Sequence, residues 1–215
     1  MPTARQAIVH SIWSRLQMIA GVAVLGIVAT ACSSGSATPL GSLVLSQLPP
    51  SFHGYVSDKA QTGSRSLAEA SKTDGLAEGT LTADGFTAGQ ESSWSQVSMG
   101  AYLGHTVDIF LYRFSTSSGA KLFATAITDQ LHKALSVAQA QGAPGEAGGM
   151  AVTTFGVPGV PGAQGYMDSE AGQSIESVVT FTKGSYWCDA QVHSPGVTAA
   201  AAMALVQAQE RNLPA

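Results

Sequence analysis

The segment from His105 to Phe114 constrains the fold most, because apolar side chains alternate on both of its faces. Val107, Ile109 and Leu111 fall on one face, and Phe110, Tyr112 and Phe114 fall on the other. A strand that is apolar on both faces is shielded on both sides, which is typical of the centre of a sheet. The segment therefore predicts a central strand.

Other segments show the same two-residue alternation and predict further strands. These strands are 85–94, 163–168, 174–182 and 186–193, with Lys183-Gly184-Ser185 as a hairpin turn between the last two. Two helices are also expected. In the first, apolar residues recur at three- and four-residue spacing between Phe123 and Ala138. The second is the Ala-rich segment 197–211.

Helices that follow antiparallel strands indicate an α+β fold. We expect an antiparallel sheet with the two main helices packed on one face, which leaves the other face partly exposed or grooved. Each half of the chain has strands and then a helix, as a duplicated strand–strand–helix unit would. Residue identity between the halves is too low to establish a repeat.

The N-terminus carries a short apolar run between a basic segment and a cysteine. Arg5 and Arg15 precede the run 18–31, and Cys32 follows it. Its 14 residues are fewer than the roughly 20 that a membrane-spanning helix needs, and they fit a signal peptide. Small residues before Cys32 and a Ser-rich stretch after it resemble the processing site of a bacterial lipoprotein.

That resemblance implies that residues 1–31 are a signal peptide and that Cys32 carries the lipid. The chain would then sit on the extracytoplasmic face of the cell membrane, held by its lipid anchor. The alternatives are a secretory signal that is cleaved after Ala31 and an uncleaved anchor. After the signal we expect a flexible tether, 32–48, and a single α+β domain, 49–215.

A second resemblance covers most of residues 43–215. It rests on a Leu-Pro-Pro entry, a Gly-Phe strand with a Trp near its end, a Gly-Val-Pro-Gly-Val-Pro-Gly-Ala segment and an Ala-rich helix that ends in Gln-Glu-Arg-Asn-Leu-Pro. Together these are similar to uncharacterised envelope lipoproteins of actinobacteria, the high-GC Gram-positive bacteria. The resemblance implies a location in the cell envelope and assigns no functional residue.

The charge balance bears on the partners of the chain. Charged residues make up only 11% of it, and its net charge is −4. All 14 acidic residues but only 8 of the 10 basic ones follow Cys32, so that part carries −6 with histidines neutral. A negative net charge of this kind does not favour binding to nucleic acid. The expected partners are the membrane, through the lipid anchor, and an envelope protein or a small apolar ligand.

No motif in the sequence indicates catalysis, a metal or a cofactor. The histidines lack the close spacing of a zinc site, and no serine-nucleophile motif stands in the folded part. With Cys32 lipidated, Cys188 has no partner and is expected to be a buried thiol. The interpretation is a non-enzymatic binding protein. The alternative is an extracytoplasmic hydrolase whose dispersed residues bring a serine or cysteine to a histidine.

One strand carries a candidate surface for a ligand or partner. Trp187 alternates with Tyr186 and Cys188, so it shares a face with Asp189, Gln191 and His193. An aromatic residue on a polar strand face is typical of a ligand or partner surface. The competing interpretation is that Trp187 packs in the core, as the other aromatic residues of the predicted elements do.

Overall fold

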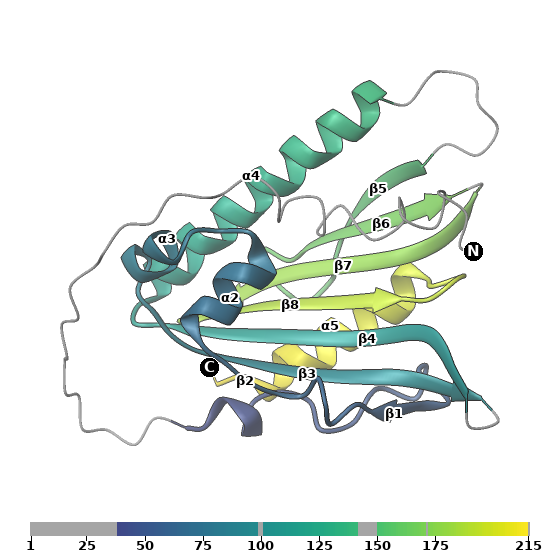
Figure 1. Ribbon diagram of the computed structural model, residues 1–215, viewed down its shortest axis with the longest axis horizontal. Coiled ribbons are helices and arrows are strands. Elements are labelled where there is room, and N and C mark those ends of the chain that lie inside the picture. Colours follow the sequence, from purple (N-terminus) through teal and green to yellow (C-terminus); the bar gives the residue numbers. More distant parts are fainter. Residues whose placement is uncertain (1–37, 99–100, 142–149, 171, 215) are drawn as a thin grey trace.

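An eight-stranded antiparallel sheet forms the centre of the molecule (Figure 1). The computed structural model describes residues 38–98, 101–141, 150–170 and 172–214. In this part the strand order is β1-β3-β4-β8-β7-β6-β5, with β2 beside β3. The strands are β1 (Tyr55–Ser57), β2 (Gly63–Arg65), β3 (Phe86–Ser98), β4 (Ala101–Phe114), β5 (Met150–Gly156), β6 (Gln164–Glu170), β7 (Gln173–Lys183) and β8 (Tyr186–His193).

β4 lies between β3 and β8, so the predicted central strand is confirmed. Its two apolar faces belong to two separate cores. Val107, Ile109 and Leu111 pack in one core, and Phe110 and Tyr112 pack in the other. The sheet is therefore covered on both sides.

Among the described residues, four α-helices and a 3-10 helix, η1, provide this cover. They are η1 (Leu40–Ser42), α2 (Leu67–Asp74), α3 (Glu78–Ala83), α4 (Ser117–Gln141) and α5 (Ala199–Asn212). α4 contributes Phe123 and Ile127 to the core with Tyr112, whereas α5 contributes Leu205 and Val206 to the core with Val107. Figure 1 shows α4 and α5 on opposite sides of the sheet.

The α+β class with an antiparallel sheet is confirmed, but the expectation of both main helices on one face is wrong. A strand with two apolar faces leaves one of them in water if every helix packs on the other, and burial of apolar surface opposes this. The second helix therefore covers the second face.

The opposite placement of α4 and α5 also argues against a simple duplication. β4 and β8 are antiparallel neighbours, so a two-fold axis that exchanges them runs perpendicular to the sheet and preserves its faces. Such an axis would place the helix after β4 and the helix after β8 on the same face. They lie on opposite faces, so the halves do not share one strand–strand–helix arrangement.

Two glycines stand at positions where a residue with a Cβ atom would be strained. Gly184 has φ of 57° in the predicted hairpin turn between β7 and β8, a left-handed conformation that suits glycine. Gly119 lies in the first turn of α4, where a Cβ atom would stand 1.8 Å from the carbonyl oxygen of Asp84. This glycine lets the start of α4 approach the end of α3.

Residues 38–48 differ from the flexible tether expected there. Leu40, Leu43 and Val44 are buried in the core on the α5 side. The fully buried Gln209 of α5 donates its Nε2 hydrogen to the carbonyl of Leu43 at 2.8 Å and accepts from the amide of Leu45 at 3.0 Å. The i, i+3, i+4 spacing of the three apolar side chains provides one buried stripe, so the packed part begins before Pro49.

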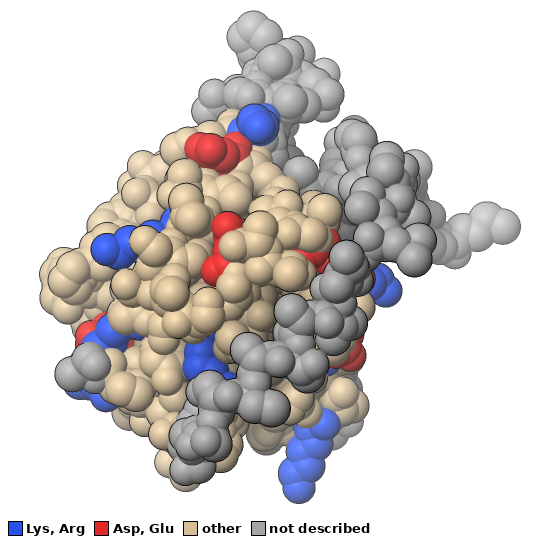
Figure 2. All heavy atoms as spheres, turned by 90° about the vertical axis from the view of Figure 1, so that its left-hand side faces the viewer, with Lys and Arg blue, Asp and Glu red and all other residues tan. Residues whose placement is uncertain are grey.

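The surface carries few charges. Figure 2 shows Lys, Arg, Asp and Glu side chains scattered among uncharged atoms on the face turned to the viewer. No helix within the described ranges combines the length and apolar character needed to cross a membrane. The predicted signal peptide and Cys32 lie outside the described residues.

Candidate ligand-binding surface

The four residues predicted as a surface share one face of β8, which is the α4 side. Pairing with β4 sets Trp187 opposite Tyr112 and Gln191 opposite Asp108. The four differ in depth, however. Trp187 and Asp189 are buried, whereas Gln191 and His193 are half-buried. The face is thus closed at one end of the strand and partly open at the other.

Trp187 lies in an aromatic cluster of the core. Its side chain is fully buried, and its ring centre is 4.8 Å from that of Phe123 and 5.1 Å from that of Tyr112. The Phe123 contact is edge-to-face, a favourable arrangement of aromatic rings. The structure therefore places Trp187 in the core, so the expectation of an exposed surface aromatic is wrong for this residue.

Asp189, Gln191 and His193 instead belong to a layer of polar side chains on five strands, which we call the polar face. Its members come from β3, β4, β6, β7 and β8, and the strand register places all of them on the α4 side of the sheet. They are Ser93, Thr106, Asp108, Asp168, Glu176, Asp189, Gln191 and His193. Four of these eight side chains are carboxylic acids.

Asp108 is held by two hydroxyl groups. Ser93 Oγ donates to its Oδ1, and Thr106 Oγ1 donates to its Oδ2 at 2.8 Å. Burial raises the pKa of Asp108, and these two hydrogen bonds act in the opposite direction. Both carboxylate oxygens of this residue therefore have partners.

Asp189 has one oxygen with a partner. Gln191 Nε2 donates to its Oδ2 at 2.7 Å, while Oδ1 has no hydrogen-bond partner among the described residues. The residue is only 1% exposed. Burial raises the pKa of Asp189 to about 7; the bond from Gln191 lowers it, and the charge of Asp108 raises it. A buried acceptor without a donor is costly, so this oxygen marks a place where a donor would be stabilised.

Glu176 and Asp168 extend the polar face toward the β5 side. Burial raises the pKa of Glu176 to about 8, with the charges of Asp168 and Asp189 adding to the effect. Burial also raises the pKa of Asp168 to about 6. His193 Nε2 lies 3.2 Å from Glu176 Oε1. Near neutral pH these acids stand between their protonated and charged forms.

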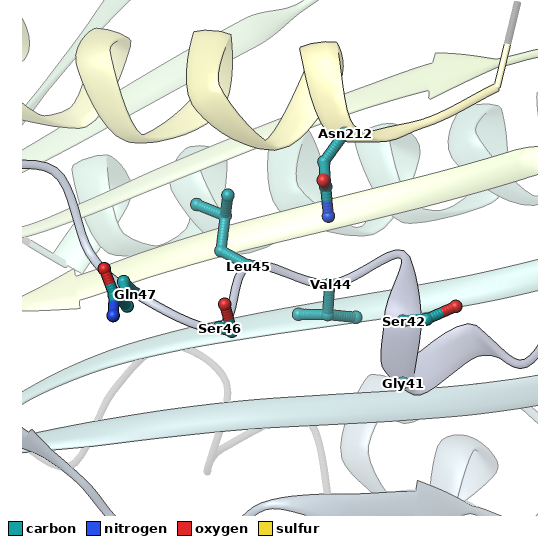
Figure 3. A pocket seen from close by; sticks show the side chains of 7 residues that line it. All are labelled: Gly41, Ser42, Val44, Leu45, Ser46, Gln47 and Asn212. Carbon is teal, nitrogen blue, oxygen red and sulfur yellow. The ribbon is translucent and has the colours of Figure 1, made fainter.

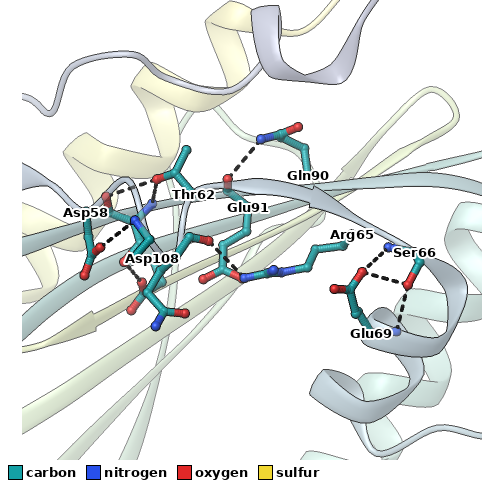
Figure 4. A network of polar contacts seen from close by, with 11 residues as sticks. Asp58, Thr62, Arg65, Ser66, Glu69, Gln90, Glu91 and Asp108 are labelled. Carbon is teal, nitrogen blue, oxygen red and sulfur yellow. Dashed lines mark hydrogen bonds and ion pairs between the residues drawn. The ribbon is translucent and has the colours of Figure 1, made fainter.

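A polar network that includes Asp108 continues this layer at its β3 end (Figure 4). Arg65 of β2 forms an ion pair with Glu91 of β3 and also donates to the carbonyl of Gln61 at 2.9 Å. Thr62 Oγ1 accepts from the amide of Ser93 at 3.0 Å. These contacts fix the short strand β2 beside β3. The register sets Glu91 opposite Phe110, so the Arg65–Glu91 ion pair also lies on the α4 side of the sheet, beside the polar face.

The sequence analysis assigned none of Asp108, Asp168 and Glu176 to a site. A usable signal was present for Asp108, which is the single acid in the mostly apolar strand β4. Such a residue faces either water or a polar layer, and the strand register decides which. Pairing β6 with β7 sets Asp168 opposite Glu176, which the sequence alone did not show.

The hydrolase alternative required a serine or cysteine beside a histidine. His105 Nδ1 lies 2.6 Å from Gln96 Oε1, and His193 pairs with Glu176. Cys188 is completely buried on the α5 side, and this burial raises the pKa of its thiol well above the ordinary value. A thiol of this kind is poorly suited to act as a nucleophile. These contacts give the alternative no support.

A pocket lies elsewhere, on the α5 side (Figure 3). It has a volume of about 310 Å³ and lies between the segment 41–47 and Asn212 of α5. Its lining includes Ser42, Ser46 and Gln47. Asn212 Nδ2 donates to the Leu43 carbonyl at 2.9 Å. A small apolar ligand prefers a predominantly apolar cavity, which this mixed lining does not provide.

The comparisons with known proteins add little to this geometry. No protein-family model and no curated protein matches the chain. Among solved structures, the extracellular domain of PknH from Mycobacterium tuberculosis is 12% identical. The match has a TM-score of 0.43 and covers 74% of this chain and 81% of that domain.

Within the described residues, no three His, Cys, Asp or Glu side chains are grouped to hold a metal ion.

Proposed function

We propose that this chain is a lipid-anchored, extracytoplasmic binding protein of the cell envelope that catalyses no reaction. Its ligand or protein partner would carry an amine or guanidinium group and bind at the polar face. The observation that carries this proposal is Asp189 Oδ1, a buried acceptor without a partner in the described residues. An N–H donor with a positive charge would satisfy that oxygen and neutralise the layer.

The charge balance of the polar face supports a cationic ligand. Four carboxylic acids lie on it, and His193 pairs with one of them. Their raised pKa values show that each carboxyl holds its proton more firmly than in water. A bound ammonium or guanidinium would replace those protons and bring the carboxyls back to the charged form. Half-buried Gln191 and His193 lie at the partly open end of the face.

We expect spermidine and arginyl-arginine amide to raise the melting temperature of the protein, because a ligand of the folded state stabilises it. Binding should be tighter at pH 8.5 than at pH 6, since the acids of pKa about 6 to 8 are charged at the higher pH. Glu176→Gln should weaken binding about tenfold by removing one buried charge. Thermal shift and isothermal titration at both pH values measure these effects.

Glu170→Gln is the matched control. Glu170 is an exposed glutamate at the end of β6, so its replacement changes net charge equally and should leave binding unchanged. Equal losses in the two variants would indicate a general charge effect and contradict a specific site. A thermal shift of equal size in sodium chloride at matched ionic strength would contradict a specific site as well.

The proposed lipid anchor at Cys32 has a separate test. Replacing Cys32 by alanine removes the thiol that would carry the lipid, so we expect the protein to leave the membrane fraction almost completely. Fractionation followed by immunoblotting measures this, with Cys188→Ala as the control that keeps Cys32. If the Cys32→Ala protein stays in the membrane fraction in the wild-type proportion, the lipid anchor is wrong, whatever the outcome of the ligand titrations.

A further inference from the structure

The two edges of the sheet are built differently. At one edge, β1 and β2 are three residues each, and Arg65 and Asp58 lie in or beside them. Short, charged and interrupted strands are among the means by which proteins keep a sheet edge from pairing with another chain. This edge is therefore protected.

The β5 edge has none of these features within its described residues. β5 is seven residues long, and its sequence, Met-Ala-Val-Thr-Thr-Phe-Gly, contains no charge and no proline. It pairs with β6 through seven consecutive residues without a register shift. The strand order of the described chain ends at β5. Ala151, Thr153 and Thr154 are exposed.

We propose that β5 is a self-association edge, at which a second copy of this chain pairs its own β5 in antiparallel orientation. The absence of charge selects this occupant, because two identical strands then meet without repulsion. Full overlap of Met150–Gly156 with its copy centres the pair on Thr153. This inference is independent of the polar face and of its ligand.

The register of the proposed pair is compatible with the two faces of the sheet. Around a two-fold axis at Thr153, Val152 lies opposite Thr154 of the copy, and Ala151 lies opposite Phe155. Each pair joins residues of the same parity, so the α4 sides of both copies lie on the same side of one continuous sheet. β-branched cross-strand pairs are favourable. Because the other edge is protected, association stops at a dimer.

Crosslinking tests this geometry directly. In an antiparallel pair, directly opposite Cα atoms are about 4.5–5.5 Å apart, which falls within the range that a disulfide spans. Thr153→Cys in the full chain should therefore form a disulfide-linked dimer under mild oxidation in membranes. Buried Cys188 should not compete. Thr125→Cys, on an exposed position of α4, is the control and should remain monomeric.

A charge pair tests the energetics. Thr153→Lys and Thr153→Asp each place like charges opposite one another, so each should weaken the dimer about fivefold, and an equimolar mixture should recover the wild-type affinity. Sedimentation of the detergent-purified full chain over two orders of magnitude in concentration measures this, with Thr125→Lys as control. A wild-type monomer throughout the range overturns the proposal. So do unchanged dimers in Thr153→Lys, a mixture that does not recover, and crosslinking of Thr125→Cys equal to that of Thr153→Cys.

Discussion

Replacing Trp187 by alanine is expected to lower the free energy of unfolding by about 3–5 kcal/mol. The indole is fully buried and contacts the rings of Tyr112 and Phe123. Removing it leaves a cavity in the core between the sheet and α4, and the rings around it lose their packing. Urea denaturation followed by circular dichroism measures the change.

Leu122→Ala is the control for this prediction. Leu122 lies on α4 beside Phe123 and is 59% exposed, so its truncation should change the free energy of unfolding by less than about 0.5 kcal/mol. A loss below about 1 kcal/mol in Trp187→Ala would mean that the indole is a surface side chain, as an exposed binding aromatic would be.

Replacing Asp189 by asparagine is expected to stabilise the protein at high pH. The folded-state pKa of about 7 lies above the ordinary value of 3.8, so the folded state holds the proton more firmly than the unfolded state. The stability linked to this group is complete below about pH 4 and is lost as the pH rises through 7. The loss is on the order of 4 kcal/mol.

Asparagine has no carboxyl to ionise, and its amide oxygen can still accept from Gln191 Nε2. Below about pH 4 the two proteins should have similar stability, and above pH 8 the variant should be the more stable. Glu176 and Asp168 titrate in both proteins, but removing the Asp189 charge also lowers the pKa of Glu176, so the difference between the two pH profiles reports Asp189 together with its coupling to Glu176. Melting temperatures from pH 4 to pH 9 measure it, and parallel profiles would contradict a buried titrating carboxyl.

The opposite consequence is expected for binding. If Asp189 is kept for a cationic ligand, the stabilised Asp189→Asn protein should bind that ligand less well. A residue that costs stability and supports binding is typical of a functional site.

Local patterns predicted the main strands and the two long helices because each has a clear period. β3, β4, β6, β7, β8, α4 and α5 all appear near their expected positions. The helix faces were not predicted correctly, although the two apolar faces of β4 contained the necessary information. β5 was missed because the residues before Phe155 alternate only weakly between apolar and polar, and η1 because it lies in an uncharged segment that was expected to be a linker.

At the candidate site, sequence patterns predict which residues share a face of one strand, but they do not predict depth or neighbours on other strands. Alternation correctly groups Trp187 with Asp189, Gln191 and His193 on one face, since it depends only on the pleat of one strand. Depth depends on which helix crosses that face, and α4 covers Trp187 with Phe123. The acids of neighbouring strands join Asp189 only through register, which is a long-range property of the sheet.

The packed segment that begins at Leu40 limits how far the folded domain can lie from the membrane in the proposed anchored protein. With a lipid on Cys32, seven residues, 33–39, separate the anchor from the first buried side chain. Seven residues span at most about 25 Å when fully extended, whereas a tether through residue 48 would have reached more than twice as far. The domain would therefore stay close to its own membrane, and a ligand or partner would have to come to the membrane to bind it.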